Sequence, residues 1–127
     1  MLRGESYAVF IECPKGVVVK TRAKVFNVKP GVYAYVGSCG LSCSSRIIRH
    51  FSKRKKVFWH IDYLSLKCRA RNSIVLRILE KKLAMILSSY GLKGVPGFGC
   101  SDDRGVETHL FMCDEKLFLE ALSSCTD

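Results

Sequence analysis

The sequence predicts a single α+β domain. With 127 residues, of which 48 % are apolar, the chain is long enough to bury one core and too short for two. β-Branched and aromatic runs dominate its first third, whereas later segments carry apolar residues at helical spacing. It contains neither an internal repeat nor a low-complexity tract. These observations predict one compact unit of strands and helices over residues 1–127.

Most of the strands are expected in the first third. The runs at 7–11 and 17–19 flank a turn and are predicted to pair as a hairpin. A short strand is expected at 24–28, and Pro30-Gly31 separates it from a strong strand at 32–36. Because side chains alternate along a strand, Tyr33 and Tyr35 should share one face of the sheet.

The first helix is predicted over residues 44–53, after a glycine turn at 37–40. Its cap is expected to be Ser42, Ser44 or Ser45. The pattern divides the helix into an apolar stripe and a basic face, which consist of Ile47, Ile48 and Phe51 and of Arg46, Arg49, His50 and Lys53. A solvated basic loop is expected next, made of Lys53, Arg54, Lys55 and Lys56.

The second half is predicted to alternate between helices and strands. Gly91 is expected to end one of the helices, because glycine adopts the left-handed conformation common at helix C-termini. The expected elements are a short helix at 58–66, a strand at 74–79, a helix at Glu80–Tyr90, a constrained loop at 95–99, an edge strand at 109–112 and a helix at 115–122.

The charge balance favours an anionic partner. Lys and Arg number 21 against 11 Asp and Glu, a formal net charge of +10, which is typical of nucleic-acid binding. A basic protein with no such partner is the alternative. No run of about 18 apolar residues is present, so we expect no membrane span. The first residues lack the pattern of a secretory leader, and a cytoplasmic location is expected.

The seven cysteines are expected to be buried or surface thiols. Their number is odd, and a reducing cytosol disfavours disulfides. Cys39 and Cys43 have a spacing that suits two zinc ligands, but no second close pair follows to complete a structural site. A small metal-thiol protein is therefore the least favoured reading.

The turn between the second tyrosine strand and the first helix suits a phosphate. Backbone amides at a helix start and nearby arginines both favour an anion. Arg46 is expected to bind a phosphate bidentately, and Arg49 and the basic loop to extend the contact along a nucleic-acid backbone from the turn at Gly37 and Ser38. A cationic helix face is also typical of an ordinary solvated surface.

Residues 31–51, GVYAYVGSCGLSCSSRIIRHF, resemble the second half of the GIY-YIG endonuclease signature and its following helix. Tyr35 begins the Tyr-Val-Gly that stands where the family has Tyr-Ile-Gly, and Arg46 and His50 match the family's helix arginine and frequent histidine. In the first half of the signature only Tyr7 matches, since Glu5 stands in place of the glycine.

Two further segments resemble one uncharacterised branch of that superfamily, common in archaea and sometimes fused to DNA-repair domains. They are the Trp-His-Ile-Asp-Tyr-Leu at 59–64 and the Pro-Gly-Phe-Gly-Cys-Ser-Asp at 96–102. The architecture we expect is a small antiparallel three-stranded core sheet flanked by helices, with an extra N-terminal β-hairpin between the tyrosine strands.

The resemblance implies phosphodiester hydrolysis with one divalent ion, Mg²⁺ or Mn²⁺, held by Glu80. It implies that Arg46 stabilises the phosphate and that Tyr7 and Tyr35 orient the attacking water. One of these tyrosines, or His50, would take the proton. Each of these side chains also has an ordinary structural reading, as core filling, a structural hydrogen bond or a helix-start carboxylate.

A second polar set is expected to line the same cleft or to serve structure, and Asp62 is expected to be structural. The other members are His60, Ser101, Asp102 and His109. The function predicted first is a metal-dependent endonuclease acting on DNA rather than RNA, directed to particular structures or to damage. A non-catalytic nucleic-acid binding module is the alternative. If the protein is an endonuclease, Tyr7, Tyr35, Arg46 and Glu80 should converge on one concave, basic surface.

Overall fold

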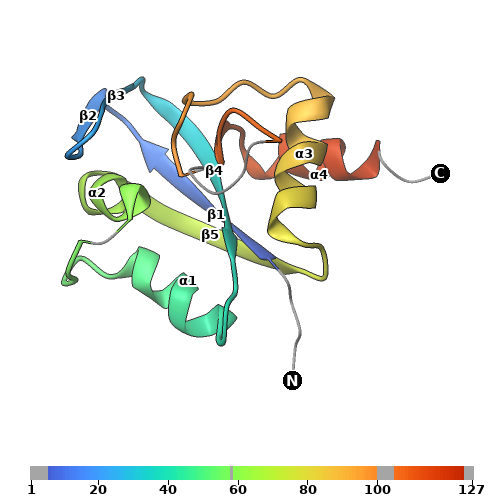
Figure 1. The fold of residues 1–127 in the computed structure, drawn as a ribbon, viewed down its shortest axis with the longest axis horizontal. Helices are drawn as coiled ribbons and strands as arrows, with labels where there is room; N and C mark the ends of the chain where they lie inside the picture. Colours follow the sequence, from blue (N-terminus) through green and yellow to red (C-terminus); the bar gives the residue numbers. More distant parts are fainter. Residues whose placement is uncertain (1–5, 58, 100–104, 125–127) are drawn as a thin grey trace.

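The computed structural model describes residues 6–57, 59–99 and 105–124. Two sheets and four helices make up this part of the chain, as Figure 1 shows. In chain order the elements are β1 (Ser6–Cys13), β2 (Val17–Lys20), β3 (Val25–Val28), β4 (Gly31–Ser38), α1 (Cys43–Phe51), α2 (His60–Lys67), β5 (Arg69–Leu76), α3 (Glu80–Tyr90), β6 (Leu110–Met112) and α4 (Glu115–Ser123). The predicted α+β class is confirmed.

The core of the domain is an antiparallel sheet with the strand order β5-β1-β4-β6. β1 pairs with β4 along its whole length, which places Tyr7 opposite Gly37. The sheet has four strands instead of the predicted three. The additional strand is the short β6, which pairs with β4 through Tyr35 and Leu110 and lies at the sheet edge as its sequence predicts.

The extra hairpin is present, but its partners differ from the first prediction. β2 pairs with β3, with Val17 opposite Val28, so the expected pairing of residues 7–11 with 17–19 is wrong. The reason is that β1 is a central strand whose two edges are occupied by β4 and β5. In the sequence the hairpin lies between the two tyrosine strands, β1 and β4. In space it extends from one end of the sheet (Figure 1).

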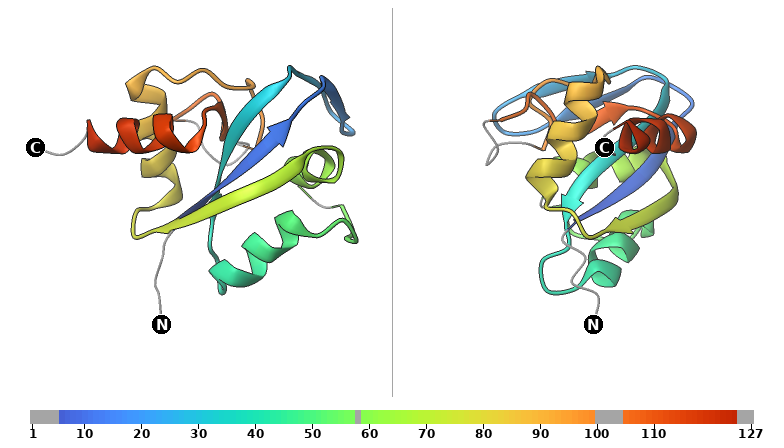
Figure 2. Two further views of the ribbon diagram at one scale, coloured as in Figure 1. Left: turned by 180° about the vertical axis from the view of Figure 1, so that it is seen from behind. Right: turned by 90° about the vertical axis from the view of Figure 1, so that its right-hand side faces the viewer.

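Helices cover both faces of the sheet. α1 and α2 lie on one side and α3 and α4 on the other, as the views in Figures 1 and 2 agree. The predicted alternation of β4 is confirmed, because Tyr33 and Tyr35 enter the core on the α1–α2 side whereas Ala34 and Val36 pack with α3 and α4. The tyrosine face of β4 is therefore the face that meets α1.

The predicted faces of α1 are wrong. Ser42 caps the helix through its side chain, as expected, but Ile48 and Phe51 are exposed and His50 is buried. The inward stripe contains Cys43, Ile47 and His50, at i, i+4 and i+7. Lys53 lies beyond the end of the helix, so the four basic groups do not form one face.

The predicted start of β5 is wrong, and the predicted bounds of α3 are confirmed. β5 begins at Arg69 rather than at residue 74, and residues 77–79 lie outside it. It is an edge strand whose first half is mostly polar and only partly buried, so the sequence carries little apolar signal there. α3 has the predicted bounds, and Gly91 follows it with φ +99°. None of the described helices has the length and apolar character needed to cross a membrane.

Four cysteines form disulfides, which corrects the expectation of free thiols. Cys13 is bonded to Cys68 and Cys39 to Cys43. The pairing of β1 with β5 explains the first bond, since it brings the end of β1 beside the residue that precedes β5. The second closes the turn before α1. Cys113 is a buried thiol.

Candidate functional site

Tyr7 and His50 form a buried hydrogen bond. The Tyr7 hydroxyl lies 2.5 Å from Nε2 of His50, and both side chains are almost fully buried. β1 places Tyr7 on the face of the sheet that α1 covers, and the phase of α1 turns His50 inward to meet it. The ring of Tyr35 lies 5.8 Å from the ring of His50, so both signature tyrosines contact the same imidazole.

Burial keeps both partners neutral. It raises the pKa of the Tyr7 hydroxyl, with the neighbouring Tyr35 adding to the shift and Arg46 opposing it. Burial also lowers the pKa of His50 to about 4, and the charge of Lys55 adds to this effect. Nδ1 of His50 is buried and has no hydrogen-bond partner among the described residues. The pair is therefore a neutral phenol against a neutral imidazole near pH 7.

Gly37 leaves the space that the Tyr7 ring fills. A Cβ built on Gly37 would lie 2.4 Å from the Tyr7 hydroxyl oxygen, far inside van der Waals contact. Gly37 was predicted as a nucleic-acid contact of the turn. In the structure it lies opposite Tyr7 on β4, where a larger residue would push the tyrosine away from His50.

Arg46 is oriented by the turn before α1. Its Nη1 donates to the carbonyl oxygen of Ser38 at 2.8 Å. Gly40 has φ +58°, and a Cβ there would lie 2.6 Å from Nη2 of Arg46. The guanidinium has five N–H donors, more than this one contact uses. The turn thus orients a half-buried cation beside Tyr7, whose pKa it lowers.

Glu80 is the first residue of α3. Its charge acts on the Tyr7 hydroxyl, whose pKa it raises. Its Oε2 lies 3.6 Å from Nδ1 of the buried His109, and its side chain is 29 % exposed. Tyr7, Tyr35 and Arg46 are thus brought together, whereas Glu80 contacts His109 and acts on Tyr7 through its charge.

Arg49 is committed to a buried carboxylate. It donates through Nε and Nη2 to the two oxygens of Asp62, at 3.2 and 2.8 Å. Asp62 is fully buried, and it also accepts from the backbone N–H of Trp59 at the start of α2. Asp62 thus has the structural role expected of it, and Arg49 serves to neutralise it.

The basic loop is largely exposed, as expected, but two of its lysines also bind α2. Lys53 donates to the carbonyl oxygen of Ser65 at 2.7 Å, and Lys55 donates to the hydroxyl oxygen of the same residue. Burial lowers the pKa of both lysines. Lys53, Arg54 and Lys56 are exposed and Lys55 is half-buried, so most of the loop's charge is open to solvent.

His60 is anchored in the core rather than in the tyrosine cluster. Its Nδ1 accepts from the backbone N–H of Gly99 at 3.3 Å, and its ring lies 5.6 Å from the ring of Phe98. Of the second polar set, His109 is the member that meets Glu80. Ser101 and Asp102 lie outside the described residues.

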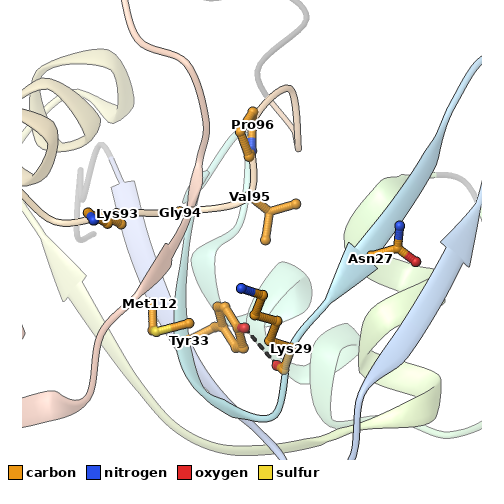
Figure 3. A pocket seen from close by; sticks show the side chains of 8 residues that line it. All are labelled: Asn27, Lys29, Tyr33, Lys93, Gly94, Val95, Pro96 and Met112. Atoms are coloured by element: carbon orange, nitrogen blue, oxygen red, sulfur yellow. Dashed lines mark hydrogen bonds between the residues drawn. The ribbon is translucent and has the colours of Figure 1, made fainter.

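A separate hollow of about 300 Å³ lies at the other end of β4. Figure 3 shows Tyr33 within it, donating from its hydroxyl to the carbonyl oxygen of Lys29 at 2.7 Å. None of the predicted catalytic residues lines it. Its lining consists of Asn27, Lys29, Tyr33, Lys93, Gly94, Val95, Pro96 and Met112.

Glu80 is the carboxylate of this region that could hold a hard divalent ion. Among the described residues no group of three or more His, Cys, Asp or Glu is placed to share a metal. A site built on one carboxylate needs no such group. Glu80 is partly exposed and its charge acts on the Tyr7 hydroxyl, and oxygen ligands with retained water suit Mg²⁺ or Mn²⁺.

Trp59 lies beside the predicted site residues but was not itself predicted to be one of them. The guanidinium carbons of Arg46 and Arg49 lie 5.5 and 5.1 Å from its ring centroid, within cation–π range. The signal was available, because Trp59 is the chain's only tryptophan and begins the segment that follows the basic loop.

Comparisons with known proteins identify the family of this chain. No curated protein matches the chain, and no solved structure does. A model of one protein family, the domain of unknown function DUF123, matches residues 6–126. Because the match covers nearly the whole chain, the protein belongs to the DUF123 family.

Proposed function

We propose that this protein is a metal-dependent endonuclease of the GIY-YIG type that hydrolyses phosphodiester bonds of DNA. The observation that supports the proposal is the buried Tyr7–His50 hydrogen bond with the Tyr35 ring beside it, together with the charges of Arg46 and Glu80 that act on the Tyr7 hydroxyl. A core that needed only apolar packing would not gather two phenols, a guanidinium, an imidazole and a carboxylate at one end of a sheet.

The proposed roles follow from the positions of the polar atoms. Arg46 would donate to the non-bridging oxygens of the scissile phosphate, where its fixed charge stabilises the charge that develops in the transition state. Glu80 would hold the divalent ion, whose charge offsets that building on the leaving oxygen. The exposed Arg54 and Lys56 would contact the flanking backbone.

The Tyr7–His50 pair would accept the proton of the attacking water. As the water oxygen bonds to phosphorus and the bond to the leaving oxygen breaks, a water proton passes to the Tyr7 oxygen. The Tyr7 proton passes at the same time to Nε2 of His50, which carries the lone pair in the Nδ1–H tautomer of the neutral imidazole. This relay avoids a free tyrosinate, which burial makes unfavourable.

The test is cleavage of labelled branched, single-stranded and duplex DNA in the presence of Mg²⁺ or Mn²⁺. Metal-dependent nicking by the parent should be lost in Glu80→Gln and in Arg46→Lys, while Glu80→Gln still binds DNA. Glu120→Gln is the matched control, since it removes the same charge from an exposed position on α4, on the sheet face opposite α1.

A parent that binds DNA in a salt-sensitive manner yet cleaves none of these substrates would contradict the enzyme. The protein would then be a nucleic-acid binding module. Nicking that persists unchanged in Glu80→Gln would equally remove the proposed metal ligand.

A further inference from the structure

Trp59 is an exposed aromatic side chain beside the proposed phosphate site. It is 45 % exposed, and it belongs to neither of the two buried clusters of the core. Its ring is nevertheless not loosely placed, because the guanidinium groups of Arg46 and Arg49 both lie over it. An indole fixed by cations but left open to solvent has surface available for another flat group.

Buried contacts hold this arrangement in place before any ligand binds. Asp62 accepts from the backbone N–H of Trp59 at 3.0 Å and from the guanidinium of Arg49. The buried carboxylate of Asp62 thereby fixes both the start of α2 and the Arg49 guanidinium that contacts the indole. Arg46 is fixed independently by the carbonyl oxygen of Ser38. Little rotamer entropy remains to be lost when a ligand stacks on the ring.

We propose that Trp59 is a stacking platform for an unpaired base next to the phosphate that Arg46 binds. The inference rests on the proposed function, and it specifies the substrate as one with a single-stranded or flipped-out nucleotide at the cleavage site. A flat aromatic face with adjacent positive charge is what unpaired bases and their phosphates bind, whereas the bases inside a duplex are already stacked.

Trp59 is the only tryptophan in the chain, so the intrinsic fluorescence of the protein reports on its surroundings. Without added metal, the fluorescence of the parent is titrated with a short single strand, with the corresponding blunt duplex and with an abasic strand of equal length. Saturable quenching is expected with the single strand and little with the duplex or the abasic strand. Because all backbones are anionic, a difference between the intact and the abasic strand isolates the base.

Variants then test the platform independently of fluorescence. Trp59→Ala should weaken binding of the single strand by about tenfold and leave binding of the abasic strand unchanged. Trp59→Phe should retain most of the affinity, because it keeps an aromatic face. Tyr90→Ala is the control, since it removes another exposed aromatic side chain at the far end of α3.

The platform and the nuclease can fail separately. Quenching by the single strand without any cleavage would remove the enzyme and support the platform. Metal-dependent cleavage by a protein whose fluorescence no strand changes, or equal affinity of Trp59→Ala and parent for the single strand, would overturn the platform and leave the enzyme. Failure of any strand to bind at low salt would overturn it as well.

Discussion

Tyr7 and His50 are 43 residues apart in the chain, yet the hydroxyl of one lies 2.5 Å from Nε2 of the other. The contact joins the central strand of the sheet to the inner face of α1. It makes His50 a buried, neutral side chain in a protein with a large positive charge, and this has a measurable effect on stability.

The first prediction is a loss of stability in mild acid. The pKa of His50 is about 4 in the folded protein and about 6.5 when unfolded. As the pH falls below 6.5, the unfolded chain binds a proton that the folded chain does not, so stability is full above pH 6.5 and declines toward pH 4. Urea unfolding at pH 7 and 4.5 should show a drop of about 2–3 kcal/mol from this group. His50→Gln should lack that part of the drop. An equal pH dependence in both proteins would show that the histidine titrates normally.

The turn at Gly40 provides a second prediction. Gly40→Ala should abolish cleavage, because the new Cβ would lie 2.6 Å from Nη2 of Arg46 and displace it. Both Gly40 and Gly91 have positive φ, but a Cβ on Gly91 meets nothing within 4 Å. Each substitution should cost about 1 kcal/mol of stability for the backbone conformation. Thermal unfolding and nicking rates measure the two effects, and only Gly40→Ala should lose activity. Full activity in Gly40→Ala would show that Arg46 does not need this turn.

The disulfides should differ in their effect on stability. The bond between Cys13 and Cys68 spans 55 residues and that between Cys39 and Cys43 spans 4. Loop-closure entropy predicts about 4 kcal/mol for the long loop and about 2 kcal/mol for the short one. Cys68→Ser should therefore lower the urea midpoint more than Cys43→Ser under non-reducing conditions. Added dithiothreitol should lower the parent's midpoint and remove the difference. A parent insensitive to dithiothreitol would contradict both bonds.

Two lysines of the basic loop should have different roles, Lys55 in stability and Lys56 in DNA binding. Lys55→Met should reduce stability by about 1–2 kcal/mol, because it removes a hydrogen bond to Ser65 in a partly buried position. Lys56→Met should leave stability unchanged and lower the slope of DNA affinity against salt by about one. Unfolding and salt titrations of both variants test this division. Equal effects on the slope would show that both lysines contact phosphate.

Glu115 should stabilise the protein except in strong acid. Hydrogen bonds from Arg71 lower the pKa of its carboxyl to about 2. The contribution is therefore present above the unfolded value of about 4.5 and is lost as the pH falls through 2. Glu115→Gln should cost about 1 kcal/mol at pH 7, since the pair is partly exposed, and much less at pH 2. Glu120→Gln, on the same helix, should cost less than half of that at pH 7. A pH-independent cost would point to packing rather than charge.

Local signals in the sequence were sufficient where an element is defined by its own residues. α3 has the predicted bounds because its amphipathic pattern ends at a glycine that adopts the left-handed conformation. The alternation of Tyr33 and Tyr35 on β4 follows in the same way from the period of a strand. These features need no information from distant parts of the chain.

Tertiary partners decided the features that the sequence did not predict. A hydropathy pattern assigns His50 to the outside of α1, and only the hydroxyl of Tyr7 explains why it faces inward. The early start of β5 depends on its pairing with β1, since Arg69 and its neighbours carry no apolar signal. The sequence singled out Tyr7, Tyr35 and His50, but it did not predict the salt bridge between Arg49 and Asp62.

The position of β1 between two later strands has a consequence for synthesis on the ribosome. Its partners, β4 and β5, end at residues 38 and 76, so one whole edge of the first strand has no partner until more than half of the chain has been made. An exposed strand edge is a template for association between nascent chains. Overproduction at a slowed translation rate should therefore favour aggregation of incomplete chains that end before β5.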